Sequence, residues 1–516
     1  MKLNYKKTIC VGLAFFLICA FWQAYDNTIP LILTNKFGMS QTLSGFIMAI
    51  DNILALFMLP LFGAISDKVH HKLGRRTPFI LVGTIIAVCA FFSLSMVDSA
   101  QLKNISSVTA IDDPNALTII YDLKKDDTLQ TLEGDRFVLS SLYTREQYTQ
   151  IKSTIVVDGK TKTNPLYTNY IVPARQSVIH DITQSNPSKL IIFISILLIA
   201  LVSMATFRSP AVALMPDVTI KPLRSKANAI INLMGTAGGM IILALGIVFK
   251  TSAVSNSFMS YKVFFGIVCL LMLAALIIFM LTVNEPKLVE EMKQESERYG
   301  IEEKEEAEAG KGKLSQDQMR SLLFILASIV LWFMGYNAVT TKYSVYATNI
   351  LHKDYNMTLM IAQGAAIISY LPVGIVASKI GRKKTILAGI IMLATSFGAA
   401  GFMKSDSPTL LMNMFFALAG IGWATINVNS FPMVVEMCSG ADVGKYTGFY
   451  YTASMAAQVV TPVISGFLMD NLGMTVLFPY ATIFVVAAFV TMQQVRHGDS
   501  RPEQKKDVLE SLDVDA

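Results

Sequence analysis

Four ionisable residues lie inside long apolar stretches of this sequence, where a charge is costly. They are Asp26, Asp51, Arg208 and Lys342. An ionised side chain at the centre of a membrane helix costs about 2.5–3.5 kcal/mol, so four facing lipid would cost on the order of 10 kcal/mol. We therefore expect these side chains to line a water-filled cavity or to pair with one another. If they only pair, they lock helices together and bind nothing. That alternative stays open, above all for Lys342, which could also lie near the outer surface.

Uncharged hydrogen-bonding side chains accompany these charges and favour a binding cavity over a purely structural role. Carboxylates, amides and an arginine match the hydroxyl groups of a sugar, and an indole matches its C–H face. Each amide taken alone could equally join two helices. The predicted substrate-binding residues are Gln23, Tyr25, Asp26, Asn52, Arg208, Asn337, Lys342, Gln363, Trp423, Asn427, Asn429 and Gln458.

The apolar stretches that carry these residues are long enough to cross a membrane. With 53% hydrophobic and 16% charged residues and a mean hydropathy of +0.50 over 516 residues, the chain is too apolar for a soluble globular protein. A helix needs about 20 apolar residues to span the hydrocarbon layer. The sequence predicts an all-α membrane protein with twelve spans, near 8–34, 43–66, 77–97, 189–216, 227–250, 261–283, 320–350, 357–378, 385–403, 408–437, 446–470 and 474–494.

Basic residues predict the orientation of these helices. Clusters around Arg75, Arg224 and Arg382 fall in alternate short loops, and the positive-inside rule then places both termini in the cytoplasm. The net charge of +6 follows from this bias, so it does not indicate nucleic-acid binding. The five histidines lie in loops or the tail, and the five cysteines lie in or beside apolar helices. We therefore expect no metal site, no cofactor and no disulfide framework, and no catalytic constellation indicates an enzyme.

The sequence repeats itself in part, which predicts two related halves. The loop from Gly63 and the loop from Gly374 share their basic pattern at an offset of 311 (374 − 63), and Tyr25 and Tyr336 keep that offset. Two six-helix halves around a central site are the simplest architecture that explains the repeat. The predicted segments are 1–97, an extracellular insert at 98–188, 189–283, a charged cytoplasmic linker at 284–319, 320–496 and a cytoplasmic tail at 497–516. The runs Leu117–Tyr121 and Thr154–Val157 alternate like strands, so the insert is expected to form a small β-rich cap, and a surface insertion with no transport role stays open.

A further group of charged residues lies at the predicted cytoplasmic ends of helices. Acidic side chains beside basic loops can hold one face of a two-bundle protein shut or cap helices. The predicted gating residues are Asp67, Arg75, Arg76, Asp217, Arg224, Arg382, Glu436 and Lys445.

These motifs resemble a known family. The loop Gly63 to Arg76 is similar to the signature between the second and third helices of the major facilitator superfamily. The stretches 74–80, 208–217 and 427–436 are similar to the glycoside–pentoside–hexuronide:cation symporters, particularly the sucrose:proton symporters and their bacterial relatives. The resemblance covers nearly the whole chain except the insert, the linker and the tail. It implies cation-coupled uptake of a disaccharide or other glycoside by alternating access.

Matches and departures at single residues refine this expectation. Asp26 sits where melibiose-type members have a sugar-binding aspartate. The sodium motif Asp-x-x-x-Asp-Pro of those members is replaced by Ala55 to Pro60, and Arg208 replaces an acid. The upstream acid of plant sucrose carriers aligns with Leu201. Sodium wants several oxygen ligands, whereas a proton needs only one carboxylate, so we favour proton coupling through Asp51 or Asp26.

The sequence therefore predicts a monomeric sugar–proton symporter in the inner (plasma) membrane, surrounded by lipid, that takes up a di- or oligosaccharide or glycoside. Sodium coupling is the less favoured variant. An exporter of drugs or metabolites, or a sugar receptor that does not transport, would share the fold and stays open.

Overall fold

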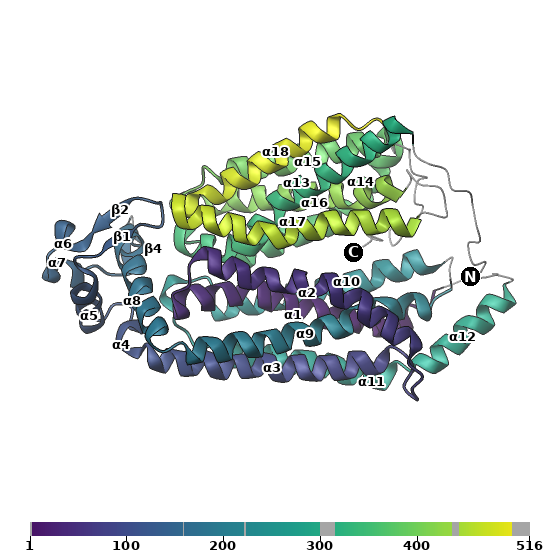
Figure 1. The fold of residues 1–516 in the computed structure, drawn as a ribbon, viewed down its shortest axis with the longest axis horizontal. Helices are drawn as coiled ribbons and strands as arrows, with labels where there is room; N and C mark the ends of the chain where they lie inside the picture. Colours follow the sequence, from purple (N-terminus) through teal and green to yellow (C-terminus); the bar gives the residue numbers. More distant parts are fainter. Residues whose placement is uncertain (1–2, 158, 221–222, 300–314, 436–442, 498–516) are drawn as a thin grey trace.

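Twelve long helices run side by side in the described part of the chain, and a smaller unit lies at one end of them (Figure 1). The computed structural model describes residues 3–157, 159–220, 223–299, 315–435 and 443–497. The long helices are α1 (Tyr5–Phe37), α2 (Gln41–Lys68), α3 (Thr77–Asn104), α9 (Ser188–Asp217), α10 (Arg224–Phe249), α11 (Lys262–Thr282), α13 (Gln316–Tyr346), α14 (Tyr355–Ile380), α15 (Arg382–Ala400), α16 (Thr409–Val435), α17 (Val443–Leu472) and α18 (Leu477–Gln493).

Eleven of these helices are long and apolar enough to cross a membrane, counted over the described residues. The remaining long helix, α14, has 26 residues and therefore measures about 39 Å at 1.5 Å per residue. It packs on α10 and α16, as the other long helices pack on their neighbours. The predicted all-α membrane architecture is confirmed.

Apolar side chains form two separate cores, one for each half. The first includes Phe21, Phe91 and Phe265 and joins α1–α3 with α9–α11, and the second includes Trp332 and Phe478 and joins α13–α18. Packing is equivalent in the two halves. In the first, α1 packs on α10 and α11, and α9 on α2 and α3; in the second, α13 packs on α17 and α18, and α16 on α14 and α15. We call these halves the first and second bundle.

Local sequence signals set where the helices begin and end. Asn4 and Ser40 cap the first turns of α1 and α2 by accepting the N–H of Lys7 and Leu43. Gly38 closes α1 in the left-handed conformation, at φ 64°.

The predicted start of the insert at residue 98 is wrong, because α3 continues to Asn104. Asp98 is fully buried and accepts a hydrogen bond at 2.5 Å from Nζ of Lys36 near the end of α1. Lys36 also donates to the carbonyl of Met259 at 2.7 Å. This buried pair looks in the sequence like two ordinary flanking charges, and only the packing of α1 against α3 brings it together.

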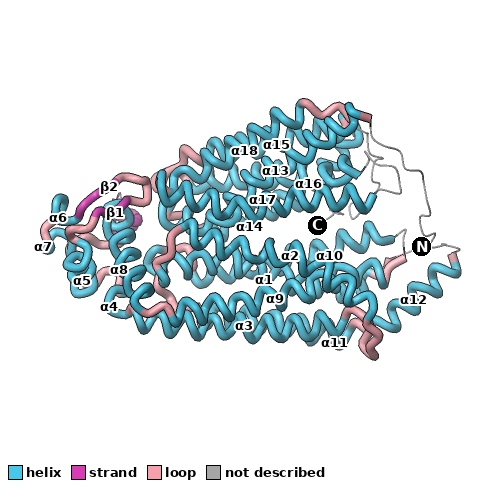
Figure 2. The backbone as a smooth tube through the Cα atoms, viewed as in Figure 1, coloured by secondary structure: helices cyan, strands magenta, loops and turns pink. Residues whose placement is uncertain are grey.

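The insert has its own apolar core, which includes Leu117, Tyr148 and Ile179. It contains α4 (Ser106–Thr109), α5 (Pro114–Lys124), β1 (Thr128–Gln130), β2 (Arg136–Val138), α6 (Leu139–Leu142), α7 (Arg145–Thr149), β3 (Thr154–Val157), β4 (Lys160–Thr163), the π-helical turn η1 (Tyr167–Ile171) and α8 (Val172–Ser185). The two hairpins β1–β2 and β3–β4 are its only strands among the described residues (Figure 2).

The prediction of a β-rich cap is therefore wrong, because helices dominate the insert. The run Leu117–Tyr121 lies in α5, where Asp113 caps the first turn and Pro114 begins the helix. The apolar residues of this run bury one helical face, which the sequence also permits. The second predicted run, Thr154–Val157, is a strand.

The start of α1, the loop between α2 and α3 and the end of α18 lie at the end opposite the insert (Figure 1). The linker begins with α12 (Glu285–Arg298), which Lys7 of α1 contacts through an ion pair with Glu291. The acidic run from Glu302 and the tail from residue 498 lie outside the described residues.

The two bundles meet most closely at the end that carries the insert. Asp470 of α17 accepts the N–H groups of Gln41 and Thr42 at the start of α2, both at 2.7 Å. A Cβ added to Gly466 would lie 2.3 Å from the carbonyl of Gln41, so only glycine permits this approach. On the other side, Thr251 after α10 bonds to the hydroxyl of Tyr355 in α14 at 2.7 Å.

Candidate functional site

A cavity of about 490 Å³ lies between the two bundles, a size typical of small-molecule sites. Its walls come from α1, α9 and α10 of the first bundle and from α13, α14 and α16 of the second. We call it the central cavity. Six predicted binding residues line it: Gln23, Asp26, Arg208, Gln363, Trp423 and Asn427.

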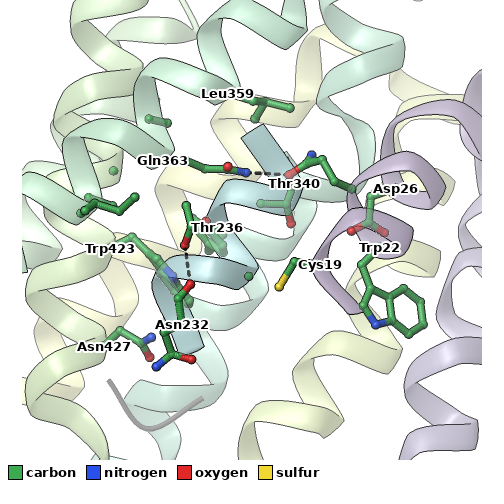
Figure 3. Close-up of a pocket in the computed structure, with 18 of the residues that line it drawn as sticks. Cys19, Trp22, Asp26, Asn232, Thr236, Thr340, Leu359, Gln363, Trp423 and Asn427 are labelled. Atoms are coloured by element: carbon green, nitrogen blue, oxygen red, sulfur yellow. Dashed lines mark hydrogen bonds between the residues drawn. The ribbon is translucent and has the colours of Figure 1, made fainter. Parts of the chain in front are cut away.

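Helix α1 presents one polar face to the central cavity. Trp22 and Asp26 lie one helical turn apart on α1 (Figure 3), and Gln23 and Asn27 repeat this spacing, so all four line the cavity. The indole Nε1 of Trp22 and the amide Nδ2 of Asn27 are buried and have no hydrogen-bond partner among the described residues. Unpaired buried donors are costly, so both atoms favour a polar ligand or water at this wall.

Arg208 of α9 supplies the positive charge of the central cavity. Its guanidinium carbon lies 6.0 Å from the centre of the Trp22 ring. Asp26 interacts electrostatically with both Asp51 and Arg208, yet no ion pair within 4.0 Å joins any of these three residues to another described residue. Asp26 and Arg208 therefore form no closed ion pair in this structure. Asp51, the predicted proton carrier on α2, lies outside the cavity wall and accepts a hydrogen bond from the side chain of Asn52 at 2.9 Å.

The second bundle contributes an aromatic wall. The rings of Tyr336 and Trp423 stack with centroids 3.6 Å apart and planes 6° from parallel. Phe333 meets the same indole edge-on at 5.1 Å. Asn427 follows Trp423 by one helical turn, so an amide lies beside the stacked rings (Figure 3). A flat apolar surface next to an amide suits the alternating C–H and O–H groups of a carbohydrate.

One hydrogen bond crosses the central cavity. Nε2 of Gln363 in α14 donates to Oε1 of Gln23 in α1 at 2.6 Å, and Oε1 of Gln363 has no partner among the described residues (Figure 3). This bridge joins the two bundles beside Asp26. A bound solute with hydroxyl groups could take over either end of the bridge.

The sequence analysis missed several lining residues, among them Trp22 and Asn27 and three more polar residues on α10 and α13. Asn232 and Thr236 lie four residues apart on α10, and Thr340 follows Tyr336 by four on α13. Thr236 donates to the carbonyl of Asn232 at 3.0 Å, within its own helix. The repeat of polar residues four apart inside apolar helices was a usable signal. In α10 it was hidden by neighbouring glycines, which pack against α1 at Phe16 and Cys19.

Three predicted binding residues lie in packed contacts instead. Tyr25 is fully buried in the first core and stacks on Phe21, with centroids 6.2 Å apart. Asn429 is buried and donates to the carbonyl of Thr425 in its own helix at 2.9 Å. Lys342 is 1% exposed and its Nζ donates to the carbonyl of Gln41 across the bundles at 2.6 Å. Lys342 therefore belongs to the bundle contact at the insert end.

Asn52, Asn337 and Gln458 are half-buried and do not belong to the wall of the central cavity. For Asn337 the helical phase is consistent with this, because neighbouring residues on a helix point about 100° apart. Asn337 follows Tyr336, which faces the cavity, and Nδ2 of Asn337 has no hydrogen-bond partner among the described residues.

The predicted gating charges of the first bundle form one cluster. The side chain of Arg76 bonds to Asp67 at 2.5 Å and to Asp217 at 2.8 Å, and Arg75 bonds to Asp217 at 2.6 Å. Burial by itself would lower the pKa of Arg76, but the hydrogen bonds to Asp217 and Asp67 raise it. Arg76 therefore stays charged and ties the ends of α2 and α9 to the start of α3.

Glu285 completes this cluster and was missed, because it lies at the second position of the predicted linker, 284–319. It is 1% exposed and accepts the N–H groups of Arg75, Arg76 and Thr77 at 2.8–3.0 Å. It thus caps α3 from another helix.

The other predicted gating residues do not form a comparable cluster among the described residues. Arg224 donates from Nε to the carbonyl of Thr219 at 3.1 Å, and Arg382 begins α15. Glu436 and the side chain of Lys445 lie outside the described part of the chain, so a matching cluster in the second bundle is not defined.

Comparisons with known proteins agree with this architecture. Residues 182–370 and 352–512 match the family described as Major Facilitator Superfamily, and residues 10–104 match the family described as MFS/sugar transport protein. The MFS-type transporter ppzB of Metarhizium rileyi is 23% identical over 122 residues, a match that spans 24% of this chain and 25% of the relative. The chain therefore matches about a quarter of the length of this curated relative.

Several solved transporters share the fold at low sequence identity. An inward-open structure of the xylose transporter XylE from E. coli has a TM-score of 0.55 and 13% identity, with 99% of each chain covered. An inward-facing bacterial homologue of the iron transporter ferroportin has a TM-score of 0.56 and 11% identity, covering 96% of this chain and 99% of that one. The nucleoside transporter NupG has a TM-score of 0.51 and 11% identity, covering 94% and 99%.

Proposed function

Because the chain belongs to the Major Facilitator Superfamily, a family of membrane transporters, we propose that it takes up a di- or oligosaccharide or glycoside together with a proton. The proposal rests on the central cavity, whose lining combines residues that carry unpaired amide and indole groups with a stacked aromatic pair. A neutral polyol satisfies these groups without bringing a charge into the membrane. The protein would act as a monomer by alternating access.

Hydrogen-bond supply explains the preference for a sugar. Trp22 and Asn27 carry donors, and Gln363 carries an acceptor, that are buried at the cavity wall without a partner among the described residues. Sugar hydroxyls are both donors and acceptors, so they can satisfy all three. An apolar drug would leave these buried groups unpaired, at about 1–3 kcal/mol each. The composition of the wall thus disfavours the alternative of a drug exporter.

Proton coupling would use Asp26 and Asp51 beside Arg208. A protonated carboxyl donates a hydrogen bond, whereas the ionised form attracts Arg208, so the proton changes how Asp26 meets both the substrate and the arginine. Asp26 can do both because it lines the cavity, while Asp51 lies behind the wall. We assign the sugar contact to Asp26 and leave the proton to the Asp26–Asp51 pair.

The contacts between the bundles would determine which end of the central cavity is open. In this structure the insert end is held together by Asp470 and Lys342. If the charged loops face the cytoplasm, as the positive-inside rule predicts, this is an inward-facing state of a plasma-membrane protein with an external insert. Substrate would leave past α10 and α16.

Thermal-shift binding followed by uptake tests the proposal. Purified protein is screened against mono-, di- and trisaccharides, and the best ligand is then followed into proteoliposomes with an inward proton gradient. We expect a stabilising sugar whose accumulation collapses when the gradient is removed. No stabilising sugar, or net export under the same gradient, would overturn the proposal.

A matched pair of variants localises the binding. Asn427→Ala removes an amide from the cavity wall, whereas Asn429→Ala removes one that bonds within its own helix. We expect at least about tenfold weaker sugar binding for Asn427→Ala, the effect of losing about 1.4 kcal/mol, and near-normal affinity for Asn429→Ala. Asp26→Asn and Arg208→Ala should keep expression and abolish uptake. Normal accumulation in those two variants would remove the central cavity as the site.

A further inference from the structure

The β1–β2 hairpin of the insert reaches from the first bundle to the second. The insert joins α3 to α9 of the first bundle, yet the hairpin turn lies on the corner between α17 and the short helix η6 (Met474–Val476). The N–H of Met474 donates to the carbonyl of Leu132 at 2.7 Å. The side chain of Leu132 is 6% exposed and packs into the core of the second bundle. A segment of one half is therefore anchored in the other.

Two glycines let the backbones of the turn and the corner touch. Gly134 has φ 109° and Gly473 has φ 90°, conformations that other residues rarely adopt. A Cβ at Gly134 would lie 2.7 Å from the carbonyl oxygen of Leu472, and one at Gly473 would lie 2.3 Å from that of Glu133. Both surfaces are therefore shaped for each other at the level of the backbone.

This contact lies beside the groups that join the bundles at the insert end. Leu472 follows Asp470 by two residues, and Asp470 caps the start of α2. When α17 moves away from α2, the corner at Gly473 must move as well. The hairpin would then lose the hydrogen bond to Met474 and would expose Leu132 to water, which is unfavourable.

We propose that residues Leu132–Gly134 form a latch that holds the two bundles together at the insert end and limits how often that end opens. The proposal rests on the proposed function only in assuming that the bundles separate there during transport. It gives the insert a role in the conformational equilibrium, distinct from binding substrate.

A distance measurement at the insert end tests the latch directly. Spin labels are placed at Val263, at the start of α11, and at Phe402, just after α15, in a protein whose five native cysteines are replaced. These side chains are 61% and 86% exposed and belong to different bundles. Pulsed electron–electron double resonance then measures the distribution of distances between the two labels in the full-length protein without substrate. The short and long distances give the populations with a closed and an open insert end.

Two glycine substitutions distinguish a loss of the latch contact from backbone strain that any alanine at a positive φ would cause. Gly134→Ala adds a methyl group against the second bundle, whereas Gly159→Ala adds the same group to the β3–β4 hairpin at φ 71° with no atom within 4 Å. We expect Gly134→Ala to raise the ratio of open to closed populations roughly fivefold or more, the effect of a modest loss of stabilisation. Gly159→Ala should leave the distances as in the wild type.

Two leucine variants test the latch independently, in case Gly134→Ala unfolds the insert. Leu132→Ala removes the buried anchor without changing the turn, and Leu142→Ala makes the same change at a side chain that is 47% exposed. Only Leu132→Ala should shift the populations. Unchanged distances in Leu132→Ala, with circular dichroism like the wild type, would overturn the latch.

The outcome is independent of the sugar experiments. If no sugar binds but Leu132→Ala still shifts the distances, the proposed substrate fails and the latch stands. If sugar uptake is coupled to protons but the distances do not respond, the latch fails alone.

Discussion

The carboxylate of Asp470 caps a helix of the opposite bundle, and replacing it by asparagine should loosen the insert end. Its two oxygens accept three hydrogen bonds at 2.5–2.7 Å, from the N–H groups of Gln41 and Thr42 and from the hydroxyl of Thr42. Asparagine keeps one acceptor and points an NH₂ group at the remaining donors. The variant also removes the negative charge near buried Lys342.

The expected magnitude follows from these contacts. A hydrogen bond to a charged group contributes about 1.5–3 kcal/mol, and a carboxylate at a helix N-terminus about 0.3–1 kcal/mol. Because Asp470 is half-buried, solvent screening weakens both, and we take about 2 kcal/mol for Asp470→Asn. That loss corresponds to roughly a thirtyfold change in the ratio of separated to joined ends.

Amide hydrogen exchange measures this change, because the N–H groups of Gln41 and Thr42 are protected only while the bundles touch. We expect faster exchange at residues 41–42 and also at 251–256 on the other side of the same end, where Thr251 contacts Tyr355. Ser40→Ala is the control, since it removes a cap from the same helix end within one bundle. Unchanged exchange at 41–42 in Asp470→Asn would refute the cross-bundle cap, and a change confined to 41–42 would refute its role in joining the bundles.

Three further predictions, two variants and one pH response, concern other charged contacts. Asp98→Asn leaves Lys36 buried without its partner, so we expect a loss of about 3–5 kcal/mol, seen as a lower melting temperature. Glu285→Gln weakens the cap on α3 and should cost about 1–3 kcal/mol in the same assay. The hydrogen bond from Lys7 lowers the pKa of Glu291, so the contact of α1 with α12 should be complete above the ordinary carboxyl pKa and lost as the pH falls through the lowered value. The fluorescence anisotropy of a label on α12 should therefore fall as the pH is lowered through that range, because the released helix moves more freely.

Controls for these variants come from exposed pairs. Asp122→Asn breaks the exposed pair with Arg145 and should hardly move the melting temperature. If Asp98→Asn behaves like Asp122→Asn, the buried pair does not stabilise the fold. Glu291→Gln should abolish the pH response of α12, and a response that persists would assign it to another group.

Much of the site could be predicted because burying charge in a membrane is so costly. Asp26 and Arg208 stand out in the sequence for this reason, and both line the central cavity. Gln23 shares a helical face with Asp26, and Trp423 shares one with Asn427, so periodicity alone selected them correctly. Tyr25 was selected by its neighbours in sequence, but it points about 100° away from Asp26 into the core. The residue type alone was therefore not enough to predict a cavity residue; its position around the helix was also needed.

The sequence by itself determined the long helices, their internal repeat and the presence of a polar interior, because hydrophobic length and the cost of buried charge are local properties of the chain. Only the tertiary structure decided which polar groups meet. Lys342 and Asp470 lie 128 residues apart (470 − 342), yet both contact the start of α2. Leu132 is an unremarkable residue of a surface insert until the fold sets it in the opposite bundle. Such contacts depend on how packed helices place distant segments, and no local pattern records that placement.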